Sequence, residues 1–234
     1  MEQLESMMSE QLVLFGCGGL AVEVAEYIRE LRVSRRSTSA PVAVSDIVAA
    51  DPGRFGDVCS ILGTEPRFHT DFQTVEDLTH KRVVICVGDP VQRHRIFRGL
   101  HQAGARFGTV VHPNAWIASS AKIGSGAIVG PFSYIGPHAV VSDNCLLNVR
   151  STIGHDAFLD TSVVISPHGD INGAARCGIA TFLGAGVILD PKVSLGAYCK
   201  VASGSVVKRS FEDGFLLVGN PADGRRMFRV PDET

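Results

Sequence analysis

An aliphatic residue returns at every sixth position from Val111 to Val207, and this period restricts the fold more than any other feature of the chain. Only Cys177 breaks the series. Four positions after each aliphatic residue stands a small or β-branched one, such as Ala121 or Ser133. A period of six fits neither the helix nor the simple alternation of a strand, so each repeat must combine a short strand with a turn.

Hexad repeats of this kind are typical of a parallel β-helix, in which three hexads form one triangular coil. Residues three hexads apart then lie above one another, and the aliphatic residues point into the prism. Stacked coils supply the core that no single coil can build. Parallel crossovers are normally right-handed, and nothing in the spacing overrides that rule.

A different pattern precedes the hexads. The apolar run Leu12–Phe15 ends in Gly16-Cys17-Gly18-Gly19, and an amphipathic helix follows to about Leu31. Such a loop lets backbone N–H groups at a helix start approach a phosphate closely. A second strand, Val42–Val44, ends at Ser45-Asp46, where an acid can hold a ribose hydroxyl.

The segment from residue 49 to 78 gives no clear pattern, and order returns with the apolar strand Val83–Val87. That strand closes on Gly88-Asp89-Pro90, where Asp89 caps and Pro90 opens a helix to about Ala103. Alternating strands and helices predict a small parallel α/β, Rossmann-like domain over residues 1–108. The β-helix domain, with a carboxyl-terminal arm, then covers residues 109–234.

The hexads, the glycine loop and Gly219-Asn220-Pro221-Ala222 in the arm together resemble the hexapeptide-repeat sugar O- and N-acetyltransferases. The resemblance is to the sialic acid O-acetyltransferase and UDP-4-amino-sugar N-acetyltransferase type, and it covers nearly the whole chain. It implies a left-handed β-helix, acetyl-CoA as co-substrate and a nucleotide-sugar acceptor. It also implies a homotrimer, with the sites between neighbouring prisms.

Acyl transfer needs a base, and His155 is the candidate because it follows Gly154 at a turn and should project outward. Asp156 can fix its tautomer and raise its basicity. Gly173 lies one coil beyond His155, where its bare N–H can serve as an oxyanion donor. The resemblance makes His155 and Asp156 the catalytic base and its partner, and Asn148 also matches the family's catalytic pattern.

The resemblance also assigns ligand contacts. Coenzyme contacts are expected at Gly173, Ala185, Ser203, Arg225 and Arg226. Substrate contacts are expected at Gly16, Gly18, Gly19, Asp46, Gly88 and His168. The chain departs from the family pattern at Leu20, Val164 and Asp223, so the contacts of those positions are open.

The first hypothesis is an N-acetyltransferase that acts on the amine of a nucleotide-linked amino deoxysugar by direct transfer. The same residues suit O-acetylation of a sugar hydroxyl, as on sialic acid. From other classes come a non-catalytic nucleotide-sugar-binding protein and a metal-dependent lyase like the β-helical carbonic anhydrases. The lyase needs three converging histidines, a pattern that His138, His155 and His168 do not match, so no metal is predicted.

The net charge of -2 gives no reason to expect nucleic acid or an anionic membrane as a partner. No segment reaches the apolar length of a membrane span, and residues 1–10 lack a signal-peptide core. The six cysteines are scattered, as in a reduced protein. These features predict a cytoplasmic protein.

Overall fold

The computed structural model describes residues 11–34, 42–76 and 78–230, so the amino-terminal tail considered above lies outside the described residues. Two compact units divide the chain. The first comprises Met1–Gly88 and Arg95–Pro113, and the second comprises Asp89–His94 and Asn114–Thr234. The chain passes from the first unit to the second after Pro113, whereas the sequence analysis expected the boundary after residue 108. The short segment 89–94 is an exception, because it belongs to the second unit.

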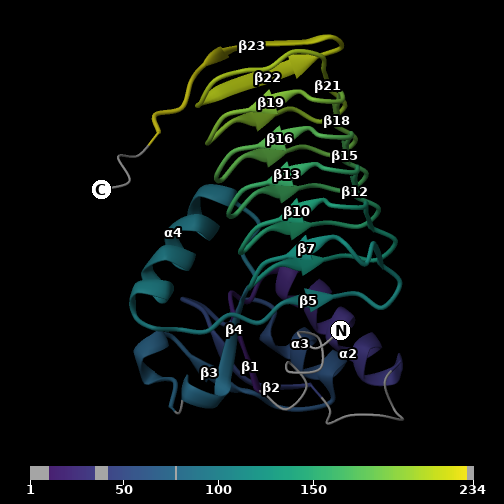
Figure 1. The fold of residues 1–234 in the computed structure, drawn as a ribbon. Helices are drawn as coiled ribbons and strands as arrows, with labels where there is room; N and C mark the ends of the chain where they lie inside the picture. The colour runs from purple at the N-terminus through teal and green to yellow at the C-terminus, as the bar shows by residue number, and fades with distance from the viewer. Residues whose placement is uncertain (1–10, 35–41, 77, 231–234) are drawn as a thin grey trace. The chain divides into compact units, whose positions relative to one another are not determined.

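The first unit contains a parallel sheet in the order β3-β2-β1-β4 (Figure 1). Its strands are β1 (Gln11–Phe15), β2 (Ala43–Val48), β3 (Arg67–His69) and β4 (Lys81–Ile85). Its remaining elements are α2 (Gly19–Ser34), α3 (Phe55–Leu62), the short 3₁₀ helices η2 (Phe72–Thr74) and η3 (Leu78–His80), and β5 (Val110–Val111). Helix α4 (Pro90–Gln102) begins in the second unit and continues in the first. The Rossmann-like α/β prediction is confirmed.

Two details of this sheet differ from the sequence-based prediction. The second strand does not end at Asp46 but continues to Val48, so Asp46 lies within the strand. The fourth strand begins at Lys81 instead of Val83. Both differences follow from pairing with β1, because Ile47 and Val48 pair with Leu14 and Phe15, and Lys81 pairs with Gln11.

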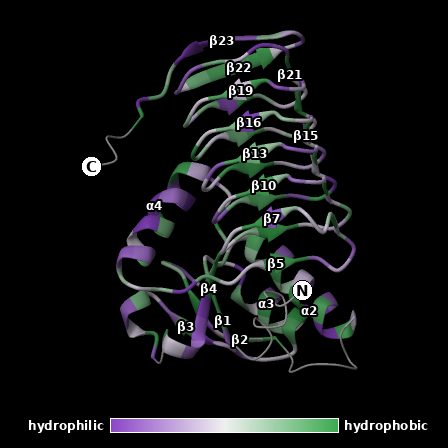
Figure 2. Cartoon of the chain, in the orientation of Figure 1, coloured by the Kyte–Doolittle hydropathy of each residue, from purple (hydrophilic) through white to green (hydrophobic). Residues whose placement is uncertain are grey.

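The second unit is a left-handed parallel β-helix built from two-residue strands (Figure 1). Strands three apart pair in parallel, as where Val140 and Val141 lie beside Phe158 and Leu159. The fully buried Ile135, Ile153 and Ile171 stack inside the prism. Figure 2 shows hydrophobic colour on successive coils of this unit. The predicted coil of three hexads is therefore confirmed.

The prism has three faces. The first face consists of β6 (Trp116–Ile117), β9 (Tyr134–Ile135), β12 (Thr152–Ile153), β15 (Asp170–Ile171), β18 (Ile188–Leu189) and β21 (Val206–Val207). The second face consists of β7 (Lys122–Ile123), β10 (Val140–Val141), β13 (Phe158–Leu159), β16 (Arg176–Cys177) and β19 (Ser194–Leu195). The third face includes β8 (Ile128–Val129), β11 (Leu146–Leu147), β14 (Val164–Ile165), β17 (Phe182–Leu183), β20 (Lys200–Val201), β22 (Phe215–Gly219) and β23 (Ala222–Arg226).

Tight turns join the faces and place side chains at the corners. Many corner residues adopt positive φ without being glycine, including His138, Asn144 and Asp156. Glycine is required at Gly154, where a Cβ atom would lie 2.7 Å from the backbone nitrogen of Gly173 in the next coil. The coils are thus stacked too closely for a side chain there.

The short segment 89–94 belongs to the second unit because polar side chains anchor it to a corner of the prism. Arg93 is fully buried, and its Nε donates to the carbonyl of Asn144 at 2.6 Å. The side-chain amide of Asn144 donates in turn to the carbonyl of Arg93 and to Ser162. As predicted, Asp89 caps helix α4, accepting from the backbone N–H of Gln92 at 2.9 Å.

Three thiols, those of Cys145, Cys177 and Cys199, lie buried in the prism. Burial raises the pKa of Cys145 to about 12 and also raises the pKa values of Cys177 and Cys199. All six cysteines are free thiols, in line with the reduced state that the sequence predicts.

Among the described residues, no helix combines the length and the apolar composition that a membrane span requires. The cytoplasmic location stays a prediction.

Candidate active site

His155 lies at the corner between the first and second faces, directly after β12 and Gly154. Its side chain is 69% exposed, so the prediction that it projects outward is confirmed. Its Nδ1 lies 2.7 Å from Oδ2 of Asp156. The backbone of Asp156 is left-handed, with φ at 60°. When Nδ1 carries the proton toward Asp156, Nε2 is left as the acceptor that a general base needs.

Gly173 lies beside the imidazole, one coil beyond it. A Cβ atom at Gly173 would meet His155 Nε2 at 2.6 Å, so the ring covers the place that a side chain would fill. The register is fixed by the backbone N–H of Ala174, which donates to the carbonyl of His155 at 2.8 Å. Nε2 of His155 therefore packs against the bare backbone of Gly173, which could not carry a side chain without displacing the ring.

Asn148 lies at a different corner, between the third and first faces. The strand β12 separates it from His155, because Asn148 precedes that strand and His155 follows it. The Oδ1 atom of Asn148 accepts the backbone N–H of Val149 at 2.8 Å. The structure of one chain therefore does not bring Asn148 to the histidine.

The same corner carries three other residues with predicted ligand roles, His168, Ala185 and Ser203. All three are exposed, and His168 has a left-handed backbone at φ 61°. The register that pairs Val164 with Phe182 and Phe182 with Lys200 stacks this corner coil upon coil. Within one chain, the predicted site residues on the coils of the prism therefore fall into two groups on two corners.

The carboxyl-terminal arm forms the antiparallel hairpin of β22 and β23. Arg225 is exposed, whereas Arg226 lies 2.6 Å from Glu212 and over the ring of Phe215. Hydrogen bonds from the backbone of Gly224 and from Arg209 lower the pKa of Asp223. The negative charge of Asp223 is paired with Arg209. Asp223 therefore does not neutralise Arg225, whose positive charge is available to a ligand.

In the first unit, the glycine loop follows β1 as predicted. Gly16 has φ 111°, and a Cβ atom there would lie 2.8 Å from the carbonyl oxygen of Cys86, so only glycine fits. Gly18 and Gly19 are exposed with open space around them, and helix α2 begins at Gly19. Gly88 is also exposed, just beyond the end of β4. These positions provide the predicted accessible backbone.

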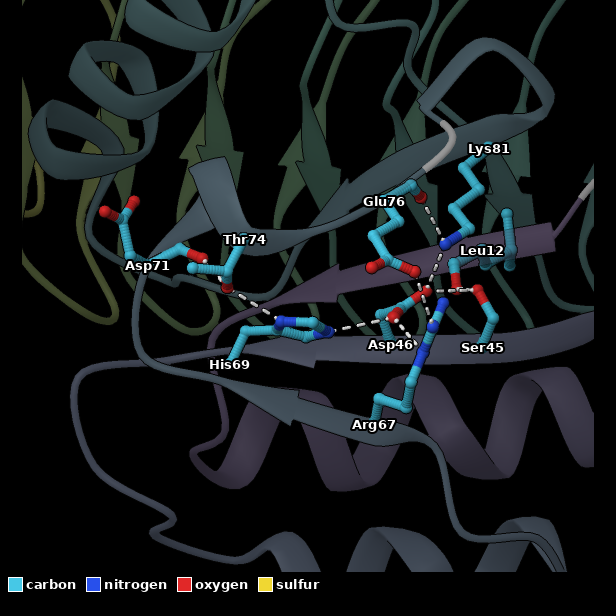
Figure 3. A network of polar contacts seen from close by, with 9 residues as sticks. All are labelled: Leu12, Ser45, Asp46, Arg67, His69, Asp71, Thr74, Glu76 and Lys81. Atoms are coloured by element: carbon cyan, nitrogen blue, oxygen red, sulfur yellow. Dashed lines mark hydrogen bonds and ion pairs between the residues drawn. The ribbon is translucent and has the colours of Figure 1, made fainter.

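Asp46 has a different position from the one expected of a ribose ligand (Figure 3). It is fully buried, and its Oδ2 lies 2.9 Å from Nζ of Lys81, which is itself 4% exposed. Its Oδ1 lies 3.0 Å from Nε of Arg67 and 2.9 Å from Nε2 of His69. The hydroxyl of Ser45 donates to Oδ2 at 2.6 Å. Both carboxylate oxygens are occupied inside the sheet, so we leave Asp46 out of the proposed substrate site.

The ionisation of Asp46 follows from these contacts. Burial alone would raise the pKa of its carboxyl, but hydrogen bonds from Ser45, Lys81 and His69 outweigh burial and lower the pKa to about 2. Sequence reasoning missed the partners, although a lysine at the start of an apolar strand was a signal that a buried acid lay nearby.

Among the described residues, no group of three or more His, Cys, Asp or Glu side chains is placed to hold a metal ion.

Comparison with known proteins shows which families the chain resembles. Residues 108–143 match the family model "Bacterial transferase hexapeptide (six repeats)". The GDP-perosamine N-acetyltransferase of Escherichia coli O157:H7 is 25% identical over 93% of this chain and 96% of its own length.

Solved structures are similar along nearly the whole chain. PerB from Caulobacter crescentus, solved with CoA and GDP-perosamine, is 26% identical with a TM-score of 0.79, over 92% of this chain and 97% of PerB. The acetyltransferase domain of PglB from Neisseria gonorrhoeae FA1090, solved with acetyl coenzyme A, is 25% identical with a TM-score of 0.79, over 93% of this chain and 100% of that domain. In its hexapeptide repeat, its two-unit fold and its sequence, the chain is similar to hexapeptide-repeat acyltransferases of the sugar acetyltransferase type.

Proposed function

We propose that this protein transfers the acetyl group of acetyl-CoA to the amine of a nucleotide-linked amino sugar. The observation that carries the proposal is the exposed pair of His155 and Asp156, with Nε2 of the histidine facing the bare backbone of Gly173. Relatives over the whole chain length are named as GDP-perosamine N-acetyltransferases or bind CoA. A GDP-linked amino sugar is therefore the first acceptor to test.

In the proposed reaction, the amine nitrogen attacks the thioester carbonyl carbon while Nε2 of His155 accepts the amine proton. The new C–N bond forms, the C–S bond breaks, and the CoA thiolate leaves and takes up a proton. The N–H of Gly173 donates to the oxyanion, and Asp156 stabilises the imidazolium. Transfer is direct, because the prism cysteines are buried and their raised pKa values keep them as thiols.

The glycine loop is proposed to hold the nucleotide through the backbone of Gly16, Gly18, Gly19 and Gly88. Arg225 and Arg226 are proposed to contact the phosphates of the coenzyme. Positive side chains with exposed guanidinium groups suit that role, and only Arg226 must give up an exposed ion pair to do so.

We further propose a homotrimer, because one chain holds only part of the site on each corner. A neighbouring copy is needed to bring Asn148, His168, Ala185 and Ser203 to the corner that carries His155. The first face between these corners supports this assembly, since Trp116 and Tyr134 stack on it at 4.8 Å while remaining 55% and 40% exposed. Large exposed apolar groups that gather on one face favour an interface.

The decisive experiment compares His155→Asn with His138→Asn, using acetyl-CoA and a GDP-linked amino sugar. His138 is a matched control because it is also an exposed histidine next to the corner, one coil earlier, and asparagine tolerates its positive φ. Loss of a general base should lower turnover by about 10² or more in His155→Asn, and the control should stay near the wild-type rate.

Near-wild-type turnover in His155→Asn would overturn the mechanism. Consumption of acetyl-CoA with sialic acid, but with no nucleotide-linked amino sugar, would replace the amine acceptor by a hydroxyl. Nucleotide-sugar binding without any acetyl transfer would leave a binding protein.

A further inference from the structure

The glycine loop lacks a positive side chain of its own. Its residues from Gly16 to Leu20 are three glycines, a cysteine and a leucine. Backbone N–H groups at the start of a helix attract phosphate, but each contributes only a partial charge. A diphosphate bound there would therefore gain from a cation supplied by another segment.

The segment that follows β2 supplies one. The backbone N–H of Arg54 donates to the carbonyl of Cys17 at 2.9 Å, which attaches this segment to the loop. Gly53 allows the approach: its φ is 43°, and a Cβ atom there would lie 2.5 Å from the oxygen of Cys17. The backbone of Arg54 is thus in direct contact with the middle of the glycine loop.

The guanidinium of Arg54 is exposed and only partly engaged. Its side chain is 55% exposed, and its Nε lies 2.5 Å from Oδ2 of Asp57. In the part of the chain that the structure describes, its two terminal nitrogens have no hydrogen-bond or ion-pair partner. An exposed ion pair contributes little stability, whereas an arginine fork binds phosphate oxygens well.

Two carboxylates lie close to Arg54. Asp51 accepts the backbone N–H of Gly53 at 2.7 Å, and Asp57 is the partner of the guanidinium. Both oppose an anion. Asp57 does so directly, because it competes with phosphate for the same side chain.

We propose that Arg54 is a substrate-binding residue that contacts the diphosphate of the nucleotide-sugar acceptor. The inference rests on the proposed function, and it adds a cation to a site otherwise made of backbone. In the absence of ligand, Asp57 pairs with the guanidinium, and the diphosphate replaces Asp57 when it binds. Arg54 then fixes the position of the acceptor and takes no part in proton transfer.

The test is calorimetric titration of the full-length protein with GDP and with UDP, in the absence of acetyl-CoA. Arg54→Gln should weaken binding of the preferred diphosphate by about tenfold or more, as expected for a lost charge-assisted hydrogen bond. Arg54→Lys should fall between Arg54→Gln and wild type, because lysine keeps the charge without the fork. Asp57→Asn should bind more tightly than wild type.

Arg29→Gln is the matched control. Arg29 is 50% exposed and pairs with Glu26 three residues away, but it lies far along α2 from the loop. Its substitution should leave diphosphate affinity unchanged, and thermal unfolding of each variant would verify the fold.

Equal affinity of Arg54→Gln and wild type for the diphosphate would overturn the inference, as would failure of both GDP and UDP to bind the wild-type protein. Weakened binding in Arg54→Gln would support it even if no acetyl transfer is found. The two proposals can thus fail separately.

Discussion

A histidine–carboxylate pair occurs in each unit, and the two pairs have opposite surroundings. In the prism, His155 and Asp156 are 69% and 56% exposed, and each has the other as its ion-pair partner. In the sheet of the first unit, His69 and Asp46 are 12% and 0% exposed. The buried carboxylate is shared with Lys81 and Arg67 (Figure 3). The same chemical pair therefore occurs in two different environments, and the proposed roles differ accordingly.

The difference indicates how a pair proposed to be catalytic can be distinguished from a structural one. A base must keep one nitrogen free to accept a proton, and the imidazole of His155 does so beside Gly173. Both nitrogens of His69 are occupied, since Nδ1 lies 2.8 Å from the hydroxyl of Thr74. Removing the acid should thus damage folding in one unit and catalysis in the other.

The largest expected effect is on folding. Asp46→Asn should destabilise the protein by about 3–5 kcal/mol, because it leaves the buried ammonium of Lys81 without a countercharge. Chemical denaturation measures this, with Asp156→Asn as the exposed control expected within about 0.5 kcal/mol of wild type. Equal stability of the two variants would show that the buried pair does not support the sheet.

The next effect is a pH dependence of stability. The folded-state pKa of Asp46, about 2, lies below the ordinary value of 3.8, so the unfolded chain binds the proton more readily. The resulting stabilisation, about 2 kcal/mol, is fully present above pH 4 and is lost as the pH falls toward 2.

Denaturation of wild type and Asp46→Asn between pH 2 and 6 tests this dependence. The stability difference between them should shrink as the pH falls from about 4 toward 2. A difference that stays constant over that range would contradict the assignment of the lowered pKa to Asp46.

The smallest effect is catalytic. Asp156→Asn should lower turnover by about fivefold, equivalent to about 1 kcal/mol, the upper range for an exposed ion pair. Unchanged turnover in Asp156→Asn would remove Asp156 from the mechanism while leaving His155 in place.

Much of the prism could be predicted from the sequence, because every coil repeats the same local rule. The period alone identified Ile153 as inward-pointing and His155 as outward-pointing, and the structure confirms both. The separation of Asn148 from His155 was also readable. The two residues are seven positions apart, more than one hexad, and therefore occupy different corners.

The first unit was less predictable, because its polar contacts join residues far apart in the sequence. Arg67, His69 and Lys81 reach Asp46 from β3 and β4, and β3 has only three residues. So short a strand gives no period, and so the sequence could not indicate which acid lies inside the sheet. The same limit hid Arg54, whose relation to the glycine loop depends on one long-range backbone bond.

The buried thiols of the prism have a practical consequence. Cys145, just before β11, lies near the amino-terminal end of the prism. Cys199, just before β20, lies near its carboxyl-terminal end. Neither can react with an alkylating reagent while its coil is closed, and their raised pKa values slow the reaction further. The order in which these sulfurs are labelled during mild denaturation therefore records from which end the prism opens.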